Sequence, residues 1–78
     1  MIVDRLSESI LIVMAERSLT YREITARLNA ERRYIPWDGL YLAEAQIRDH
    51  VRRHPEYFAI DRESKPSRVC RFLPQKRE

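Results

Sequence analysis

Pro55 constrains the fold of this chain more than any other residue. In the segment before it, EAQIRDHVRRH, Ile47 and Val51 are four residues apart and therefore fall on one face of a helix. Proline disfavours helical backbone at the residue that precedes it, so this helix must end by His54. The stretch that starts at Tyr57 alternates between two faces, which is typical of a strand. The sequence thus predicts a helix from about residue 43 to 54 and then a strand.

Two more helices are predicted upstream. Leu6, Ile10 and Met14 follow helical spacing, and either Ser7 or Ser9 is a candidate N-cap for this first helix. The segment TYRE at residues 20–23 has the pattern of a capping box, in which a threonine and a glutamate each accept from the other's backbone amide. A second helix of about ten residues is expected to start there. Its inner face is predicted to carry Tyr21, Ile24 and Leu28, with Asn29 as the place where it frays.

Two strands are predicted after the proline. Residues 57–61 and 68–73 alternate, and the polar segment 62–67 between them is turn-forming, so together they read as a β-hairpin. Phe58 and Ile60 are expected to face the core. For the second strand both faces remain open, either Cys70 with Phe72 or Val69 with Leu73. Three helices followed by a C-terminal hairpin wing is the order of a winged helix-turn-helix, which is an α+β fold. The sequence predicts a single domain of this kind over residues 1–74 and a polar tail at 75–78.

Composition excludes several classes of protein. The 78-residue chain is long enough for one core, and its single cysteine, Cys70, allows neither an internal disulfide nor a cysteine zinc site, which favours a reducing cytoplasm. The longest apolar run, ILIVMA from Ile10, is far shorter than the ~20 residues of a membrane span, so no membrane partner is expected. With one glycine there is no glycine-rich phosphate loop, and no paired-acid motif occurs. The sequence predicts neither an enzyme nor a cofactor.

The net charge of +3 is concentrated in the second half. Residues 1–40 carry equal numbers of acidic and basic side chains, so the whole excess lies in 41–78 and favours a polyanionic partner. With Ile47 and Val51 inward, the outer face of the third helix is predicted to offer an amide and arginines to DNA, and the hairpin and second helix to add further cations. The predicted DNA-binding residues are Gln46, Arg48, Arg52, Arg53, Arg62, Lys65, Arg68 and Arg22. The alternative is a solvated face, which the acidic Asp49 among these residues favours.

Two other features of the sequence have a structural and a functional interpretation. His50 and His54 have a spacing that suits zinc, but no third ligand is evident, so no metal site is predicted. The preferred interpretation is that histidine at the C-terminal end of a helix is stabilised by the helix dipole. The connector at residues 34–41 is unusually apolar, with Tyr34, Ile35, Trp37 and Tyr41 as candidate interaction residues. It is expected to fold back over the first helix, or else to form an interface.

The sequence also resembles a known family. LTYREITARLN at residues 19–29, WDG at 37–39, QIR at 46–48, Val51 and PEYF at 55–58 are similar to the HARE-HTH winged-helix family, whose pattern runs pLtyrEI…iN, then DG, then QI…V…yP..F. The similarity covers roughly residues 6–72. It implies a winged helix that contacts DNA, as in the restriction enzymes, helicase-like proteins and chromatin regulators with which the family is associated. The chain departs from the pattern between Arg32 and Leu42, where apolar residues replace a more polar, basic connector.

These observations predict a small regulatory or accessory protein that binds double-stranded DNA. The third helix would lie in the major groove and the hairpin on the adjacent backbone. The alternative is a protein-interaction module, or a homodimer, that uses the aromatic connector 34–41.

Overall fold

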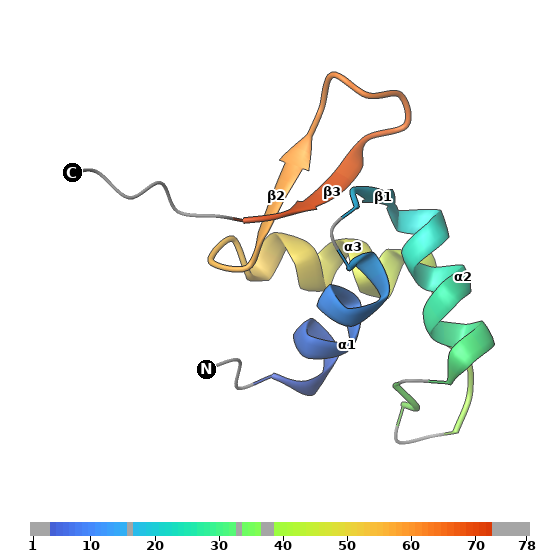
Figure 1. Ribbon diagram of the computed structural model, residues 1–78. Helices are drawn as coiled ribbons and strands as arrows, with labels where there is room; N and C mark the ends of the chain where they lie inside the picture. The colour runs from blue at the N-terminus through green and yellow to red at the C-terminus, as the bar shows by residue number, and fades with distance from the viewer. Residues whose placement is uncertain (1–3, 16, 33, 37–38, 73–78) are drawn as a thin grey trace.

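The chain forms three helices and one small antiparallel sheet (Figure 1). The computed structural model describes residues 4–15, 17–32, 34–36 and 39–72. In chain order the elements are α1 (Arg5–Met14), β1 (Leu19–Thr20), α2 (Tyr21–Glu31), α3 (Glu44–Arg53), β2 (Phe58–Asp61) and β3 (Arg68–Arg71). The predicted α+β class is therefore confirmed, and the order of elements is compatible with a winged helix. None of the helices in these ranges has the length and apolar character needed to cross a membrane.

The sheet has the order β1-β3-β2, with both neighbouring pairs antiparallel. Ile60 pairs with Val69, and Val69 is fully buried whereas Cys70 is half-buried, so the second strand turns its Val69 face to the core. This register favours the Val69 face over that of Cys70 and Phe72, and Leu73, predicted on the Val69 face, lies outside the described residues. The strand β1 was not predicted, because its two residues are too few to show an alternating pattern.

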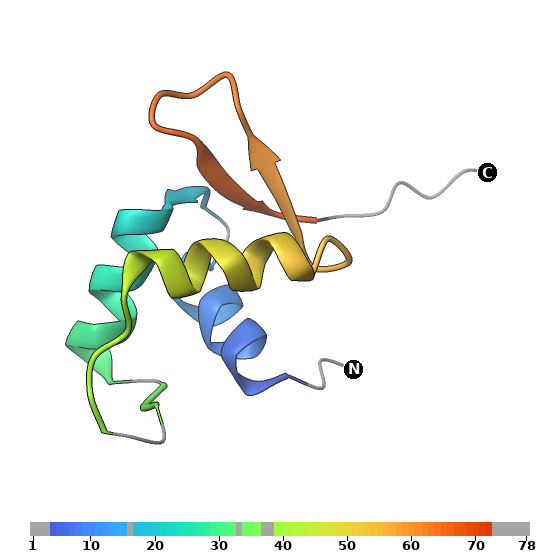
Figure 2. The same cartoon turned by 180° about the vertical axis from the view of Figure 1, so that it is seen from behind.

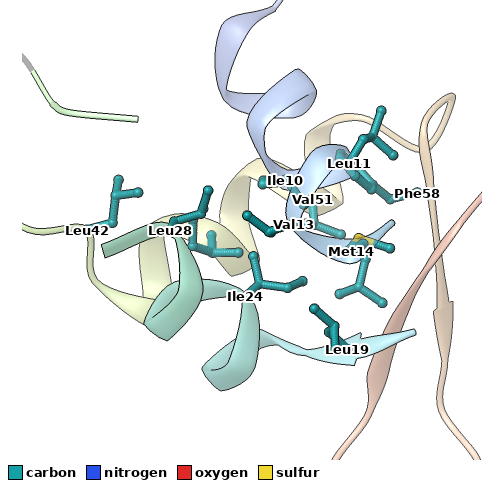
Figure 3. Packing of buried hydrophobic residues seen from close by; sticks show 12 residues of the cluster. Ile10, Leu11, Val13, Met14, Leu19, Ile24, Leu28, Leu42, Val51 and Phe58 are labelled. Carbon is teal, nitrogen blue, oxygen red and sulfur yellow. The ribbon is translucent and has the colours of Figure 1, made fainter. Parts of the chain in front are cut away.

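The core lies where the three helices meet the sheet (Figure 3). Each helix contributes two or more side chains, and burying a large aliphatic side chain fully stabilises the fold by about 1.5–3 kcal/mol. The buried apolar residues are Ile10, Leu11, Val13, Met14, Leu19, Ile24, Leu28, Leu42, Ile47, Val51, Phe58 and Val69. Because Ile47 and Val51 anchor α3 from within, its outer face, with Gln46, Asp49 and Arg53, stays exposed to solvent.

The first helix begins one turn earlier than either serine would place its start. Its N-cap is Asp4, whose Oδ1 accepts from the amide of Leu6 at 3.0 Å, so the expectation of Ser7 or Ser9 as the cap is wrong. Both serines lie inside the helix and are buried, and the Ser9 hydroxyl donates to the carbonyl of Arg5 at 2.9 Å. Aspartate and serine cap helices about equally well, so residue type did not favour Asp4 over the serines.

A side chain of the sheet holds the C-terminal end of α1 in place. Ala15 has φ 53° and ψ −118°, and the amide of Arg17 donates to the carbonyl of Met14 at 2.9 Å. These angles are those of the first central residue of a type II′ turn. The Arg71 guanidinium on β3 donates to the carbonyls of Leu11 and Ala15, both at 3.2 Å, and so adds a second donor to the Leu11 carbonyl, which also accepts from the amide of Ala15 at 3.0 Å.

The second helix starts as the sequence predicts and ends later. Thr20 and Glu23 form the full capping box, with hydrogen bonds of 3.0 and 3.1 Å. The helix runs on to Glu31, so Asn29 does not mark its end. The Asn29 side-chain amide instead makes two hydrogen bonds to the backbone of Leu42, one as donor at 2.9 Å and one as acceptor at 2.8 Å. Asn29 therefore ties α2 to the residues that lead into α3.

Candidate nucleic-acid interface

A groove opens between α3, the start of α2 and the hairpin β2–β3, with a volume of about 620 Å³. Figure 2 shows α3 crossing beneath the hairpin with the first turn of α2 at its side. The residues that line the groove are Thr20, Tyr21, Arg22, Glu44, Arg48, Arg52, Ile60, Arg62, Pro66 and Ser67. Four of them are arginines, and they come from α2, α3 and the residue that follows β2.

Helical geometry explains why α3 sends two arginines into this groove. Ile47 and Val51 face the core, and at 100° per residue Arg48 and Arg52 fall on the flank next to them. Pro55 fixes where the helix stops, with His54 as its C-cap. At the other end Gln46 accepts from the amide of Ala43 at 2.7 Å, which is half of a capping box.

Arg48 is held in place by two neighbours. Its guanidinium lies 3.6 Å from the Glu44 carboxylate one turn earlier and 5.6 Å from the centre of the Tyr21 ring. The first contact is an ion pair between residues four apart, of the kind expected on a solvated helix face. An exposed pair of this kind contributes only a few tenths of a kcal/mol, so Arg48 can exchange its partner at little cost. Glu44 is the one acidic side chain in the groove lining, so the groove is positively charged.

The N-terminal end of α2 adds its helix dipole to the same groove. The amide of Thr20 donates to the Glu23 carboxylate, and with the positive charges of Arg68 and Arg27 it holds the pKa of Glu23 below its ordinary value of 4.5. Glu23 is therefore ionised at neutral pH and offsets part of the positive end of the helix. The net attraction for an anion in the groove comes from the arginines.

The other predicted DNA-binding residues do not line the groove. Gln46 and Arg53 project from the outer side of α3, and Lys65 lies exposed in the hairpin loop. The Arg68 guanidinium donates to the carbonyl of Ser18 at 3.1 Å, so it braces β3 against the entry to β1. The prediction of Arg68 as a DNA-binding residue missed this contact with Ser18, because β1 itself was not predicted.

Six lining residues were not proposed as contacts from sequence, namely Thr20, Tyr21, Glu44, Ile60, Pro66 and Ser67. Tyr21 was expected to pack in the interior, and Pro66 and Ser67 were not singled out. Tyr21 is half-buried: it packs against the core and also lines the groove. The capping box already places Tyr21 in the first turn of α2, but its contact with the groove depends on where α3 and the hairpin pack.

No family model matches the chain, and neither a curated protein nor a solved structure shows significant similarity to it. The resemblance to the HARE-HTH family therefore stays a prediction.

The aromatic connector lies at the end of the molecule away from the hairpin tip (Figures 1 and 2). Tyr34 packs against the core, as folding back requires, but Ile35 and Tyr41 are 55% and 69% exposed. The Arg32 guanidinium lies 4.6 Å from the centre of the Tyr41 ring and donates to the carbonyl of Gly39 at 3.1 Å. Trp37, the fourth candidate interaction residue, lies outside the described residues.

The flank of α3 opposite the groove carries both histidines. The His50 Nε2 lies 2.6 Å from the Asp4 Oδ2 and 2.8 Å from the Ser7 hydroxyl, and the His54 Nε2 lies 3.4 Å from the same Asp4 oxygen. Burial lowers the pKa of His50 more than the Asp4 carboxylate raises it. Burial raises the pKa of Asp4, but hydrogen bonds from Ser7 and Leu6 and the adjacent imidazoles outweigh this and leave it below its ordinary value. At neutral pH a neutral imidazole therefore meets a carboxylate.

Proposed function

We propose that this protein binds double-stranded DNA, with the groove between α3 and the hairpin holding a phosphate backbone. The observation that carries the proposal is the convergence of Arg22, Arg48, Arg52 and Arg62, from separate elements, on one groove with a single carboxylate in its lining. Arginine pairs with phosphate through a planar fork of donors and stays charged at any physiological pH. Scattered surface arginines would not produce such a lining.

The helix α3 suits the major groove of the same duplex. A helix with its side chains is about 10–12 Å across and the major groove is about 12 Å wide, so the exposed side of α3 can enter it. That side carries Gln46, Asp49 and Arg53, which are able to read adenine, cytosine and guanine edges. The carbonyl oxygen of Gln46 already accepts from Ala43, so a bidentate contact with adenine requires it to share that oxygen. Phosphate contacts in the groove would then position the protein on the duplex, and base contacts from α3 would supply any sequence specificity.

Replacing groove arginines tests this directly. Arg48→Ala and Arg52→Ala should each weaken binding to a labelled duplex by about 1 kcal/mol, roughly fivefold, and reduce the salt dependence by about one unit of slope. Arg5→Ala is the matched control, because it removes the same charge from an exposed site on α1 that does not line the groove. Equal losses in all three variants would show that only net charge matters and would refute the groove as the site.

A second candidate function rests on the connector. Ile35, Leu40 and Tyr41 are 55%, 64% and 69% exposed, a local concentration of apolar surface that suits self-association or a larger protein partner. Sedimentation equilibrium should then show a mass that rises with concentration, and Ile35→Asp should restore the monomer. A monomer at high concentration in the parent chain would remove the self-association version. Because the connector and the hairpin tip lie at opposite ends, such a dimer could still bind DNA (Figure 1).

The proposal assigns the protein a regulatory or accessory role in DNA transactions in the cytoplasm. A free, half-buried Cys70 suits a reducing compartment, where it stays a thiol.

A further inference from the structure

We propose that Asp4, His50 and His54 form a binding site for a divalent transition-metal ion of the zinc class. The inference does not depend on the proposed DNA binding, since the cluster lies on the flank of α3 away from the groove. From sequence the histidine pair lacked a third ligand. The fold supplies it from the opposite end of the chain, where Asp4 caps α1.

The ligand atoms are close to the spacing that zinc requires. Zinc binds histidine nitrogen and carboxylate oxygen at about 2.0–2.2 Å, which places neighbouring ligand atoms about 3.3 Å apart in a tetrahedron. The Asp4 Oδ2 and the His54 Nε2 already lie 3.4 Å apart, and the three ligand atoms all lie within 4.8 Å of one another. The Asp4–His50 contact of 2.6 Å is a hydrogen-bond distance and must open by about 0.7 Å.

Both elements that carry the ligands are fixed by the core. His50 and His54 are one turn apart on α3, so their rings project from the same flank of a helix whose inner face is buried through Ile47 and Val51. Asp4 is held by its own hydrogen bond to the first turn of α1, whose Ile10 is fully buried. The site is therefore largely formed before an ion arrives, which reduces the cost of binding.

Two of the three ligands already have the supporting contacts that metal ligands need. The Ser7 hydroxyl, fully buried, donates to the Asp4 Oδ2 at 2.9 Å. The Glu56 carboxylate lies 3.5 Å from the Nδ1 of His54, the ring nitrogen that faces away from the cluster. A carboxylate on the far nitrogen of a ligating histidine orients the ring and raises its basicity. Two histidines, one aspartate and these partners leave a fourth position for water.

An ion at this site would join the first turn of α1 to the last turn of α3. It would fix the end of α3 next to Pro55, where the chain enters β2. We expect the ion to act as a structural clamp, because a metal that binds only the folded state stabilises it by mass action.

Isothermal titration of the full 78-residue chain with zinc chloride tests the site. One ion should bind per chain, and both Asp4→Asn and His54→Ala should weaken binding at least tenfold. Asparagine caps helices as well as aspartate does, so Asp4→Asn preserves α1 while removing the carboxylate. Asp49→Asn is the control, since it removes an exposed carboxylate from the outer face of the same helix. Circular dichroism checks that each variant is folded.

Two further readouts keep the result independent of any one variant. Cobalt should give the visible absorption of a tetrahedral nitrogen and oxygen site in the parent chain and in Asp49→Asn, and lose it in His54→Ala. Zinc should raise the thermal midpoint of the same two proteins only. No zinc binding by the parent chain, or equal weak binding by all variants, would overturn the proposal and leave Asp4, His50 and His54 as a hydrogen-bonded cluster.

Discussion

At the scale of the residue, Glu23 makes the start of α2 sensitive to acid. Its carboxylate accepts from the Thr20 amide, and its pKa in the folded chain lies below the ordinary 4.5. A lowered carboxyl pKa adds stability above the unfolded pKa, and this is lost as pH falls through the folded pKa. Glu23→Gln keeps the acceptor without the charge. The free energy of unfolding of the parent should therefore exceed that of Glu23→Gln at pH 7 by a margin that shrinks below about pH 4.5. A margin independent of pH would contradict this account.

Ala15 is the residue whose backbone least suits its side chain. Its φ of 53° and ψ of −118° belong to a turn position dominated by glycine. Ala15→Gly should raise the free energy of unfolding by about 0.5–1 kcal/mol, because the relieved strain exceeds the entropy that glycine loses on folding. Ala26→Gly, exposed within α2, should lower it by about 0.5–1 kcal/mol. Urea unfolding of both variants measures the two changes, and a loss in both would show that Ala15 is not strained.

At the scale of the element, local signals were sufficient for the helices and the hairpin. Pro55 ended α3 where expected, and the capping box at Thr20 and Glu23 began α2, because both effects act within a few residues of their source. The features that escaped prediction depend on partners distant in sequence. Neither the pairing of β1 with β3 nor the Arg68 contact with Ser18 leaves a periodic signal. Asp4 was missed as a cap because two serines competed for the same role.

The link between α2 and α3 depends on Asn29. Its two hydrogen bonds pair the amide and carbonyl of Leu42, a residue whose side chain is buried. Asn29→Ala should lower the free energy of unfolding by about 1–3 kcal/mol, since both backbone groups lose their partner. Arg27→Ala, exposed on the same helix, should change it by less than about 0.5 kcal/mol. Chemical denaturation compares the two, and a similar small loss in both would mean that Asn29 does not anchor the connector.

At the scale of the whole molecule, α3 separates two different surfaces. One flank carries arginines into the groove beside the hairpin, and the other carries the histidines that meet Asp4. Helical periodicity predicted which residues leave the core but not what each flank would face, since that depends on where the hairpin and α1 pack. The sequence therefore predicted correctly that Arg48 and Arg52 point away from the core, where Arg52 is exposed and Arg48 half-buried. Their convergence with Arg22 and Arg62 and the approach of Asp4 required the fold.

The measurement that tests the central claim most directly is fluorescence anisotropy of a labelled random-sequence duplex at about 50 and about 200 mM salt. If each of the four groove arginines contacts one phosphate, the logarithm of affinity should fall with the logarithm of salt at a slope of about −3.6, a loss of about a hundredfold between the two conditions. No binding at the lower salt concentration, or binding that does not change with salt, would contradict the assignment of the groove to DNA.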